Sequence, residues 1–157
     1  MDDLAIGSPQ SSERTFPATV IAISQARNFV GTFASQWAFS APRLADIQLA
    51  TSELATNAVV HGRGPTFRVG LVGSVSGLQL EVESTGTATV PQIRRPMQHE
   101  RTGRGLLIVS RLADRLTVHS TEVGVTLSCD FDVERPDQHR GTNSGASSTA
   151  PSQRNTQ

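Results

Sequence analysis

Hydrophobic side chains recur along this chain with two different periods, and each period predicts a different type of element. From about residue 20 to residue 38 they recur at three- and four-residue steps, which predicts an amphipathic helix. The same period predicts a second helix that begins at Pro42, a residue suited to the first helical position, and stops at Gly62. The buried stripe of this second helix should contain Leu44, Ile47, Leu54, Ala55 and Ala58.

Beyond the second helix the period changes to two, which is typical of half-buried strands. Two alternating runs, 67–71 and 78–82, are joined by a glycine-containing turn and predict an antiparallel hairpin. A glycine-rich segment then leads to a short helix near 106–113 and to two further strands, around 116–118 and 125–133. Helices beside hairpin-type strands predict an α+β fold, in which helices pack on one face of a mainly antiparallel sheet.

The folding unit lies between two polar ends. Residues 1–13 are mostly polar, and residues 135–157 contain no large aliphatic or aromatic side chain, so we expect both ends to be disordered. The folding unit then spans residues 14–134. A chain of 157 residues with 36% hydrophobic content suits one domain of this size.

The charge and cysteine content exclude several classes of protein. Lys plus Arg and Asp plus Glu each number 14, so no global field attracts the chain to nucleic acid or to an anionic membrane. The single cysteine, Cys129, excludes an internal disulfide and suits a reducing compartment. No apolar run approaches the ~18 to 20 residues of a membrane helix, and the acidic start "MDDLAIGSPQ" is unlike a secretory signal. We therefore expect a cytoplasmic protein.

Three polar residues, Glu53, Asn57 and His61, lie at intervals of four on the second predicted helix. Each step of four residues turns by only about 40° around the helix axis, so the three side chains form one ridge beside the buried stripe. From spacing alone, the simpler interpretation is a solvated helix face with a histidine near the C-terminal dipole.

The order of the residues in "ELATNAVVH", 53–61, favours a more specific interpretation. This segment resembles the N-box of the ATPase superfamily that unites gyrase, heat-shock chaperone, mismatch-repair and histidine-kinase nucleotide domains, and more narrowly the serine-kinase branch of anti-sigma factors. The resemblance implies a two-layer Bergerat-type ATP-binding fold. It assigns Glu53 to the attacking serine hydroxyl as the catalytic residue, and Asn57 to Mg²⁺ between the phosphates of ATP. Both residue types suit these roles chemically, whereas the resemblance implies no role for His61.

A second motif, "RTGRGLLIV" at 101–109, resembles the glycine box of the same family at the end of the ATP lid. On its own, Gly-x-Gly is also compatible with a flexible turn before a helix. Its glycines let backbone N–H groups approach phosphate, and the helix dipole favours an anion. The aperiodic segment of about twenty residues before this helix then acts as the lid. The nucleotide-binding residues that the resemblance implies are Asn57, Ser84, Gly86, Arg101, Thr102, Gly103, Arg104, Gly105 and Leu106.

The sequence departs from the family where adenine is recognised. The family usually shows Asp-x-Gly, whose aspartate accepts the adenine amino group, whereas this chain has "STG" at 84–86. Strand alternation directs Ser84 toward the helices and Glu83 away from them, so no carboxylate replaces the aspartate. A charged acceptor contributes ~1.5 to 3 kcal/mol and a neutral one ~0.5 to 1.5, so the loss is roughly 1 to 2 kcal/mol, or on the order of tenfold in affinity. ATP binding is weakened by this substitution and not excluded.

Two functional hypotheses follow from the resemblance. The first is a serine/threonine protein kinase of the anti-sigma type, which phosphorylates a serine on an antagonist protein and controls transcription through a sigma factor; the presence of Glu53 and Asn57 favours it. The second is a non-catalytic or weakly nucleotide-binding module of the same fold, which Ser84 favours. Relatives of this type commonly act as homodimers, which the sequence neither shows nor denies.

A two-component output kinase is a third, less favoured class. It needs a phosphoacceptor histidine on a dimerising helix, and three histidines fall instead in the lid, in a strand and in the tail. They are His99, His119 and His139.

Overall fold

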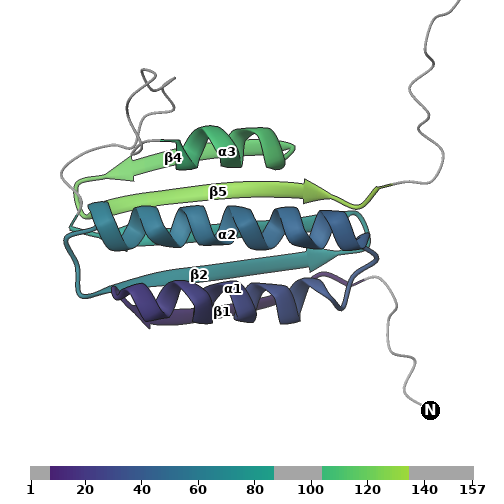
Figure 1. Cartoon of the computed structure of the whole chain (residues 1–157), viewed down its shortest axis with the longest axis horizontal. Helices are drawn as coiled ribbons and strands as arrows, with labels where there is room; N and C mark the ends of the chain where they lie inside the picture. The colour runs from purple at the N-terminus through teal and green to yellow at the C-terminus, as the bar shows by residue number, and fades with distance from the viewer. Residues whose placement is uncertain (1–7, 87–103, 135–157) are drawn as a thin grey trace, which may run out of the picture.

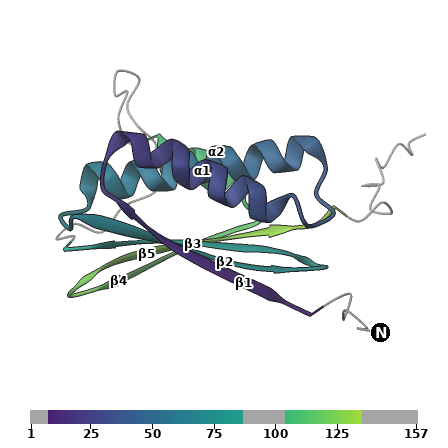
Figure 2. The ribbon, with the colours of Figure 1, turned by 90° about the horizontal axis from the view of Figure 1, so that it is seen from below.

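The computed structural model describes residues 8–86 and 104–134, which form two layers. Three helices lie on one face of a five-stranded sheet, as Figures 1 and 2 show from two directions. No helix in these two ranges is long and apolar enough to cross a membrane. The elements are β1 (Gln10–Pro17), α1 (Val20–Ala34), α2 (Ala41–His61), β2 (Thr66–Ser74), β3 (Gly77–Thr85), α3 (Gly105–Leu112), β4 (Arg115–Thr121) and β5 (Gly124–Asp132).

The strand order is β1-β2-β3-β5-β4, and every pair of neighbouring strands is antiparallel. The predicted α+β fold, with helices on one face of an antiparallel sheet, is therefore confirmed. The helix that interrupts the strand sequence, α3, lies above β4 and β5, whereas α2 lies over the middle of the sheet (Figure 1).

Strand alternation divides the side chains between the two faces of the sheet as predicted. On the open face, the guanidinium of Arg68 donates to Glu83 at 3.1 Å and to Glu13 at 3.0 Å, and these bonds raise its pKa. The helix-covered face is apolar and carries the core. Its buried hydrophobic strand residues are Phe16, Phe67, Val69, Leu71, Leu78, Leu80, Val82, Val125, Leu127, Cys129 and Phe131.

The helix bounds differ from the predicted ones mainly at the end of α1. The helix ends at Ala34 rather than near residue 38, because the chain turns there and the N–H of Trp37 donates to the carbonyl of Ala34 at 3.1 Å. Trp37 kept the hydrophobic period in the sequence, but it packs against the sheet from outside the helix. The second helix has the predicted extent, and its N-cap Ser40 accepts from the N–H of Arg43 at 3.3 Å.

The N-terminal boundary of the folding unit was predicted too late. Residues 10–13, assigned to the disordered N-terminus, belong to β1, whose pairing with β2 runs from Gln10 opposite Gly73 to Pro17 opposite Thr66. Only Phe16 of this strand is buried. An edge strand of this kind is held by its ladder of backbone hydrogen bonds rather than by burial, so its polar composition concealed it. The predicted disorder of residues 1–7 and 135–157 concerns positions outside the described residues.

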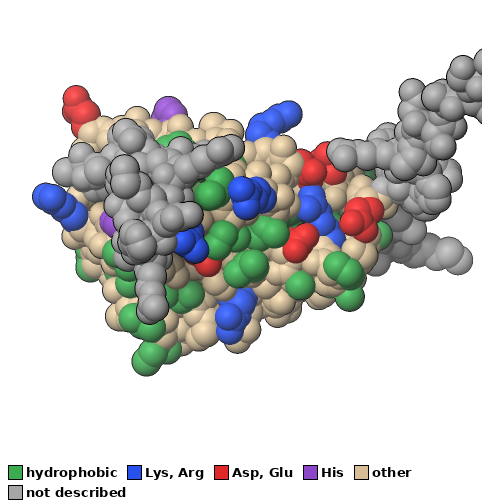
Figure 3. Space-filling view, turned by 45° about the horizontal axis from the view of Figure 1, so that its top comes forward, with side chains coloured by type: hydrophobic (Ala, Val, Ile, Leu, Met, Phe, Trp, Pro, Cys, Tyr) green, Lys and Arg blue, Asp and Glu red, His purple; other side chains and the backbone are tan. Residues whose placement is uncertain are grey.

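The surface matches the balanced composition of the chain. On the face that Figure 3 displays, arginine side chains and acidic side chains both occur, with hydrophobic side chains between them. The exposed charges therefore give no reason to expect recognition of a polyanion on this face.

Candidate functional site

The candidate site lies where the C-terminal half of α2 meets the N-terminal end of α3. Along α2 the buried stripe includes Leu54 and Ala58, and the predicted polar ridge lies beside it. Glu53 and Asn57 are half-buried, whereas His61, the last residue of the helix, is exposed. The first two members of the ridge therefore border the interior, and the third faces solvent.

Glu53 lies directly against the first residue of α3. A Cβ atom placed on Gly105 would lie only 2.6 Å from Oε2 of Glu53 and 3.7 Å from its Cβ. The carboxylate thus occupies the space that any larger residue at position 105 would fill. This contact explains the second glycine of the lid motif, because a side chain at position 105 would push the carboxylate of Glu53 out of its place.

The N-terminal end of α3 offers backbone donors. The helix has eight residues, and its N-cap, Arg104, makes no side-chain cap hydrogen bond within the described part of the chain. The first N–H groups of a helix have no partner inside the helix, and the helix dipole gives this end a partial positive charge. An anionic group such as a phosphate is favoured at this position.

The end of β3 forms the other side of the site. Ser84 is 6% exposed and lies on the helix-covered face, while Glu83 lies on the open face and accepts from Arg68, as strand alternation predicted. A Cβ atom on Gly62, the C-cap of α2, would lie 3.2 Å from Cβ of Ser84. The neutral serine therefore packs directly against the end of the helix that carries the ridge.

Gly86 continues this wall with a left-handed backbone, φ +68°. A Cβ atom there would lie 3.2 Å from Cβ of Arg63, and the N–H of Gly86 donates to the carbonyl of Val123 at 2.8 Å. A left-handed φ is readily adopted only by glycine, so the backbone conformation explains why glycine stands at this position of the motif.

The other predicted site residues are placed unevenly. Arg104 is exposed, and Leu106 is 6% exposed within the hydrophobic core, so its side chain anchors α3 and only its backbone N–H can face a ligand. Arg101, Thr102 and Gly103, together with the predicted lid, lie outside the described residues.

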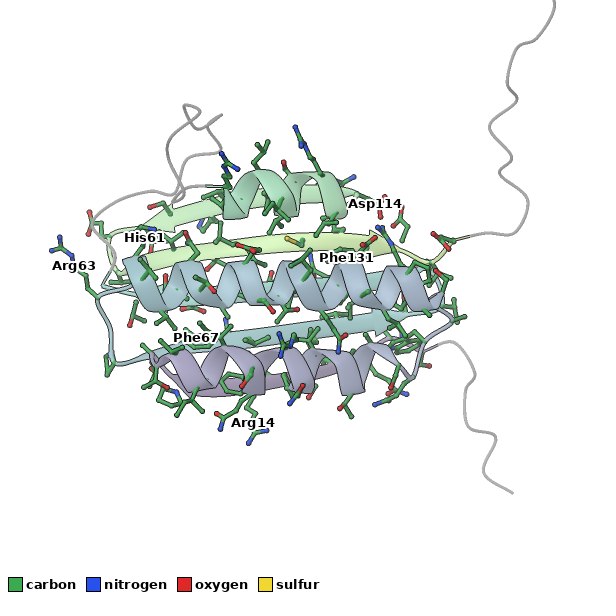
Figure 4. All side chains as sticks on the ribbon, in the orientation of Figure 1. Arg14, His61, Arg63, Phe67, Asp114 and Phe131 are labelled. Atoms are coloured by element: carbon green, nitrogen blue, oxygen red, sulfur yellow. The ribbon has the colours of Figure 1, made fainter. Side chains whose placement is uncertain are left out.

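The sequence prediction overlooked the short connection after α2. The N–H groups of Arg63 and Gly64 both donate to the carbonyl of Thr85, at 3.2 and 2.9 Å. These bonds tie the end of α2 to the end of β3, beside the exposed side chains of His61 and Arg63 that Figure 4 labels. The available signal was the pair of glycines that flank Arg63 directly after the N-box.

The residues present fit a nucleotide with Mg²⁺. Within residues 8–86 and 104–134, no group of three or more His, Cys, Asp or Glu side chains could hold a metal ion by itself. Mg²⁺ in nucleotide sites is usually held by one or two protein oxygens, with phosphate oxygens and waters completing the shell. The amide oxygen of Asn57, one helical turn from Glu53 on the same ridge of α2, can supply such a ligand.

A separate surface hollow of about 400 Å³ lies between β1 and α1, and none of the candidate residues lines it. Figure 4 labels one of its lining residues, Arg14, at the edge of the molecule opposite α3. It is distinct from the ridge and the α3 terminus. Its lining residues are Arg14, Gln25, Asn28, Phe29 and Thr32.

Comparisons with known proteins identify the family of this chain. Residues 16–130 match the family described as histidine kinase-like ATPase domain. The anti-sigma F factor of Thermoanaerobacter sp. (strain X514) is 29% identical over 108 residues, which cover 62% of this chain and 76% of that protein. The anti-sigma F factor of Bacillus velezensis (strain DSM 23117 / BGSC 10A6 / LMG 26770 / FZB42) is 30% identical over 116 residues, which cover 66% and 80%.

A solved structure shares the fold. The crystal structure of the RsbU and RsbW domains of Rv1364c from Mycobacterium tuberculosis matches with a TM-score of 0.64 and 20% sequence identity. The match covers 81% of this chain and 33% of that longer chain. At this level of identity the likeness shows the fold alone.

Proposed function

Because the chain belongs to the histidine kinase-like ATPase domain family, we propose that it binds ATP with Mg²⁺ between α2 and α3 and acts as an anti-sigma protein kinase. In this role it transfers the γ-phosphoryl group to a serine of an antagonist protein and so controls a sigma factor. The relatives named anti-sigma F factor support this choice among the activities of the fold.

The contact between Glu53 and Gly105 carries the proposal. It brings a carboxylate to the end of a helix where phosphate is favoured. The amide oxygen of Asn57 would hold the metal ion, which neutralises charge on the phosphates when bound. Glu53 would orient the serine hydroxyl and accept its proton as the serine oxygen bonds to the γ-phosphorus and the bond to the leaving ADP oxygen breaks.

Nucleotide binding is tested by calorimetric titration of the whole chain with ATP, with Mg²⁺ or with a chelator. Asn57→Ala should weaken binding by about ten- to a hundredfold in the presence of Mg²⁺ and much less in its absence. Asn28→Ala removes the same group from an exposed position on α1 and should leave binding unchanged. No heat of binding and no change in melting temperature at millimolar ATP would refute the nucleotide site.

Phosphoryl transfer is tested with γ-labelled ATP and the protein that co-purifies with this chain from its source cells. Glu53→Gln keeps the size of the side chain and removes its basicity, so it should retain ATP binding and lose about 10²- to 10⁴-fold in labelling. Equal labelling by the variant would refute the role of Glu53. Label on histidine rather than serine would refute the proposed type of kinase.

A second function, a binding module without efficient turnover, is favoured by one observation. Ser84 is buried on the helix-covered face at the position where the resemblance implies a carboxylate. Such a module would hold its protein partner with the same affinity in the presence and in the absence of ATP, and would transfer no label. The two experiments above therefore separate the two functions.

A further inference from the structure

Arg43, in the first turn of α2, links this helix to α3, to the connection before β4 and to β5. Its Nη1 donates to the carbonyl of Leu112, the last residue of α3, at 2.7 Å, and its Nη2 pairs with the carboxylate of Asp114, which precedes β4. The guanidinium carbon lies 5.1 Å from the ring centroid of Phe131 on β5. The side chain is only 12% exposed, so these interactions are screened less than those of a surface ion pair. Figure 4 labels Asp114 and Phe131 at this end of α3.

These contacts act on the end of α3 that is opposite the candidate site. A helix of eight residues is not stable alone, and the last carbonyl groups of a helix lack partners inside it. Arg43 supplies a donor and a positive charge to the last of these carbonyl groups. Asp114 is itself held, because its carboxylate also accepts from the N–H of Asp132 at 2.8 Å. The C-terminal end of α3 is therefore fixed relative to α2 and the sheet.

The other end of α3 is in contact with the same helix. At ~1.5 Å per residue, Glu53 lies about 15 Å further along α2 than Arg43, and Gly105 lies about 10 Å from Leu112 along α3. The two helices thus run antiparallel, and α2 contacts both ends of α3. A shift of α3 along α2 would move the backbone of Gly105 away from its place beside Glu53.

We propose that Arg43 is a positioning residue for the nucleotide site, which holds α3 in register on α2 so that its N-terminal donors stay beside Glu53. This inference rests on the proposed function, and it assigns the control of nucleotide affinity to a side chain at the far end of the helix. Arg43 does not touch the nucleotide in this arrangement. It acts through the axial position of α3.

The test measures the dissociation constant for ATP with Mg²⁺, the melting temperature, and amide hydrogen exchange of residues 105–112 without nucleotide. Arg43→Met should raise the dissociation constant by about ten- to a hundredfold, a range typical of groups that orient a binding shell. Arg43→Lys and Asp114→Asn should each give a smaller loss, because each keeps part of the contact. All three should accelerate exchange in α3.

Arg68→Met is the matched control. Arg68, like Arg43, is an arginine paired with a carboxylate, in its case Glu83 and Glu13, but it lies on the open face of the sheet, away from α3. This variant should lower the melting temperature without changing the dissociation constant. Titrations are made well below the unfolding transition of every variant, and the milder Arg43→Lys keeps the test decisive if Arg43→Met does not fold.

The outcomes are distinguishable. If Arg43→Lys and Asp114→Asn lower the melting temperature as Arg68→Met does, with affinity and exchange in α3 unchanged, Arg43 is a structural residue only and the inference is overturned. If the unmodified chain binds no ATP, the proposed function fails first and the positioning role fails with it. Binding by the unmodified chain, with graded loss in the three variants, supports both.

Discussion

Replacing Gly105 with alanine should disturb Glu53 while sparing the fold. The new methyl group would lie 2.6 Å from Oε2 of Glu53, about 0.8 Å closer than an ordinary contact of 3.4 Å. The atom in its way is the end of a flexible, half-buried side chain, so the carboxylate can turn aside without moving the backbone. The variant therefore displaces the proposed catalytic group by close to 1 Å.

The two consequences have opposite signs. Alanine favours a helix over glycine by roughly 0.5 to 1 kcal/mol, so the melting temperature should stay the same or rise. A displacement near 1 Å of a group that must align with the attacking oxygen can cost about 10²-fold in rate. We expect ATP affinity to change little, because α3 keeps its place, and phosphoryl transfer to fall by about ten- to a hundredfold.

The assay is transfer from γ-labelled ATP to the co-purified partner, with the melting temperature measured in parallel. Gly31→Ala is the matched control, since its methyl group would meet another flexible side-chain end, Nε2 of Gln48, at 2.3 Å. This contact lies where α1 packs on α2, on the opposite side of α2 from α3 (Figure 1). This control should leave transfer unchanged. If Gly105→Ala transfers phosphate at the rate of the unmodified chain, the carboxylate of Glu53 has no positional role and the mechanism is wrong.

Three further outcomes can be measured. Gly73→Ala would place a methyl group 2.2 Å from Nε1 of the rigid Trp37 ring, and should lower the free energy of unfolding in urea by about 1 to 3 kcal/mol; an unchanged value would show that the ring is free to move. Ser84→Asp should tighten ATP binding about tenfold by calorimetry, whereas unchanged affinity would show that adenine is not read there. Burial, and to a lesser extent the charge of Asp130, raise the pKa of the Cys129 thiol from 9.0 to about 12. The chain has neither Lys nor Tyr, the other side chains that ordinarily titrate at about pH 10. The stability that this raised pKa contributes is complete below pH 9 and is lost as the pH rises toward 12. The free energy of unfolding should therefore fall between pH 9 and pH 12, and Cys129→Ala should remove most of this dependence on pH.

The sequence predicted an element well where its hydrophobic residues recur with a clear period and all pack on one face. The second helix was predicted with nearly its observed bounds, and the hairpin of β2 and β3 was predicted with its central residues but shorter than observed, because the apolar positions of these elements all face one core. The strand β1 was not predicted, because an edge strand needs few buried side chains once its backbone is paired. The end of α1 was placed too late, because Trp37 continues the helical period of the sequence but lies beyond the helix, where its ring packs against Gly73 of β2.

The candidate site was predictable only where it depends on one element. Intervals of four placed Glu53 and Asn57 on one ridge, and strand alternation placed Ser84 inside and Glu83 outside. The contact of Glu53 with Gly105 depends on how α3 docks on α2, and no local pattern encodes it. The same holds for Arg43, whose bond to the carbonyl of α3 joins residues 69 positions apart.

Ser84, which stands where the family usually has an aspartate, bears on the choice between the kinase and the binding module. The loss of a charged acceptor for adenine reduces affinity by roughly 1 to 2 kcal/mol, on the order of tenfold, and a higher ATP concentration compensates for it. Loss of the Glu53 carboxylate would instead remove an interaction with the attacking serine hydroxyl, and no concentration of ATP restores the rate that this interaction contributes. The chain keeps Glu53, which contacts the first residue of α3, and Asn57 one turn further along α2, and it has Ser84 where the resemblance implies an acid for adenine recognition. On the proposed function, this pattern favours a kinase with weakened nucleotide affinity over a module that has lost the chemistry, and a transfer rate that reaches a normal plateau at high ATP would distinguish the two.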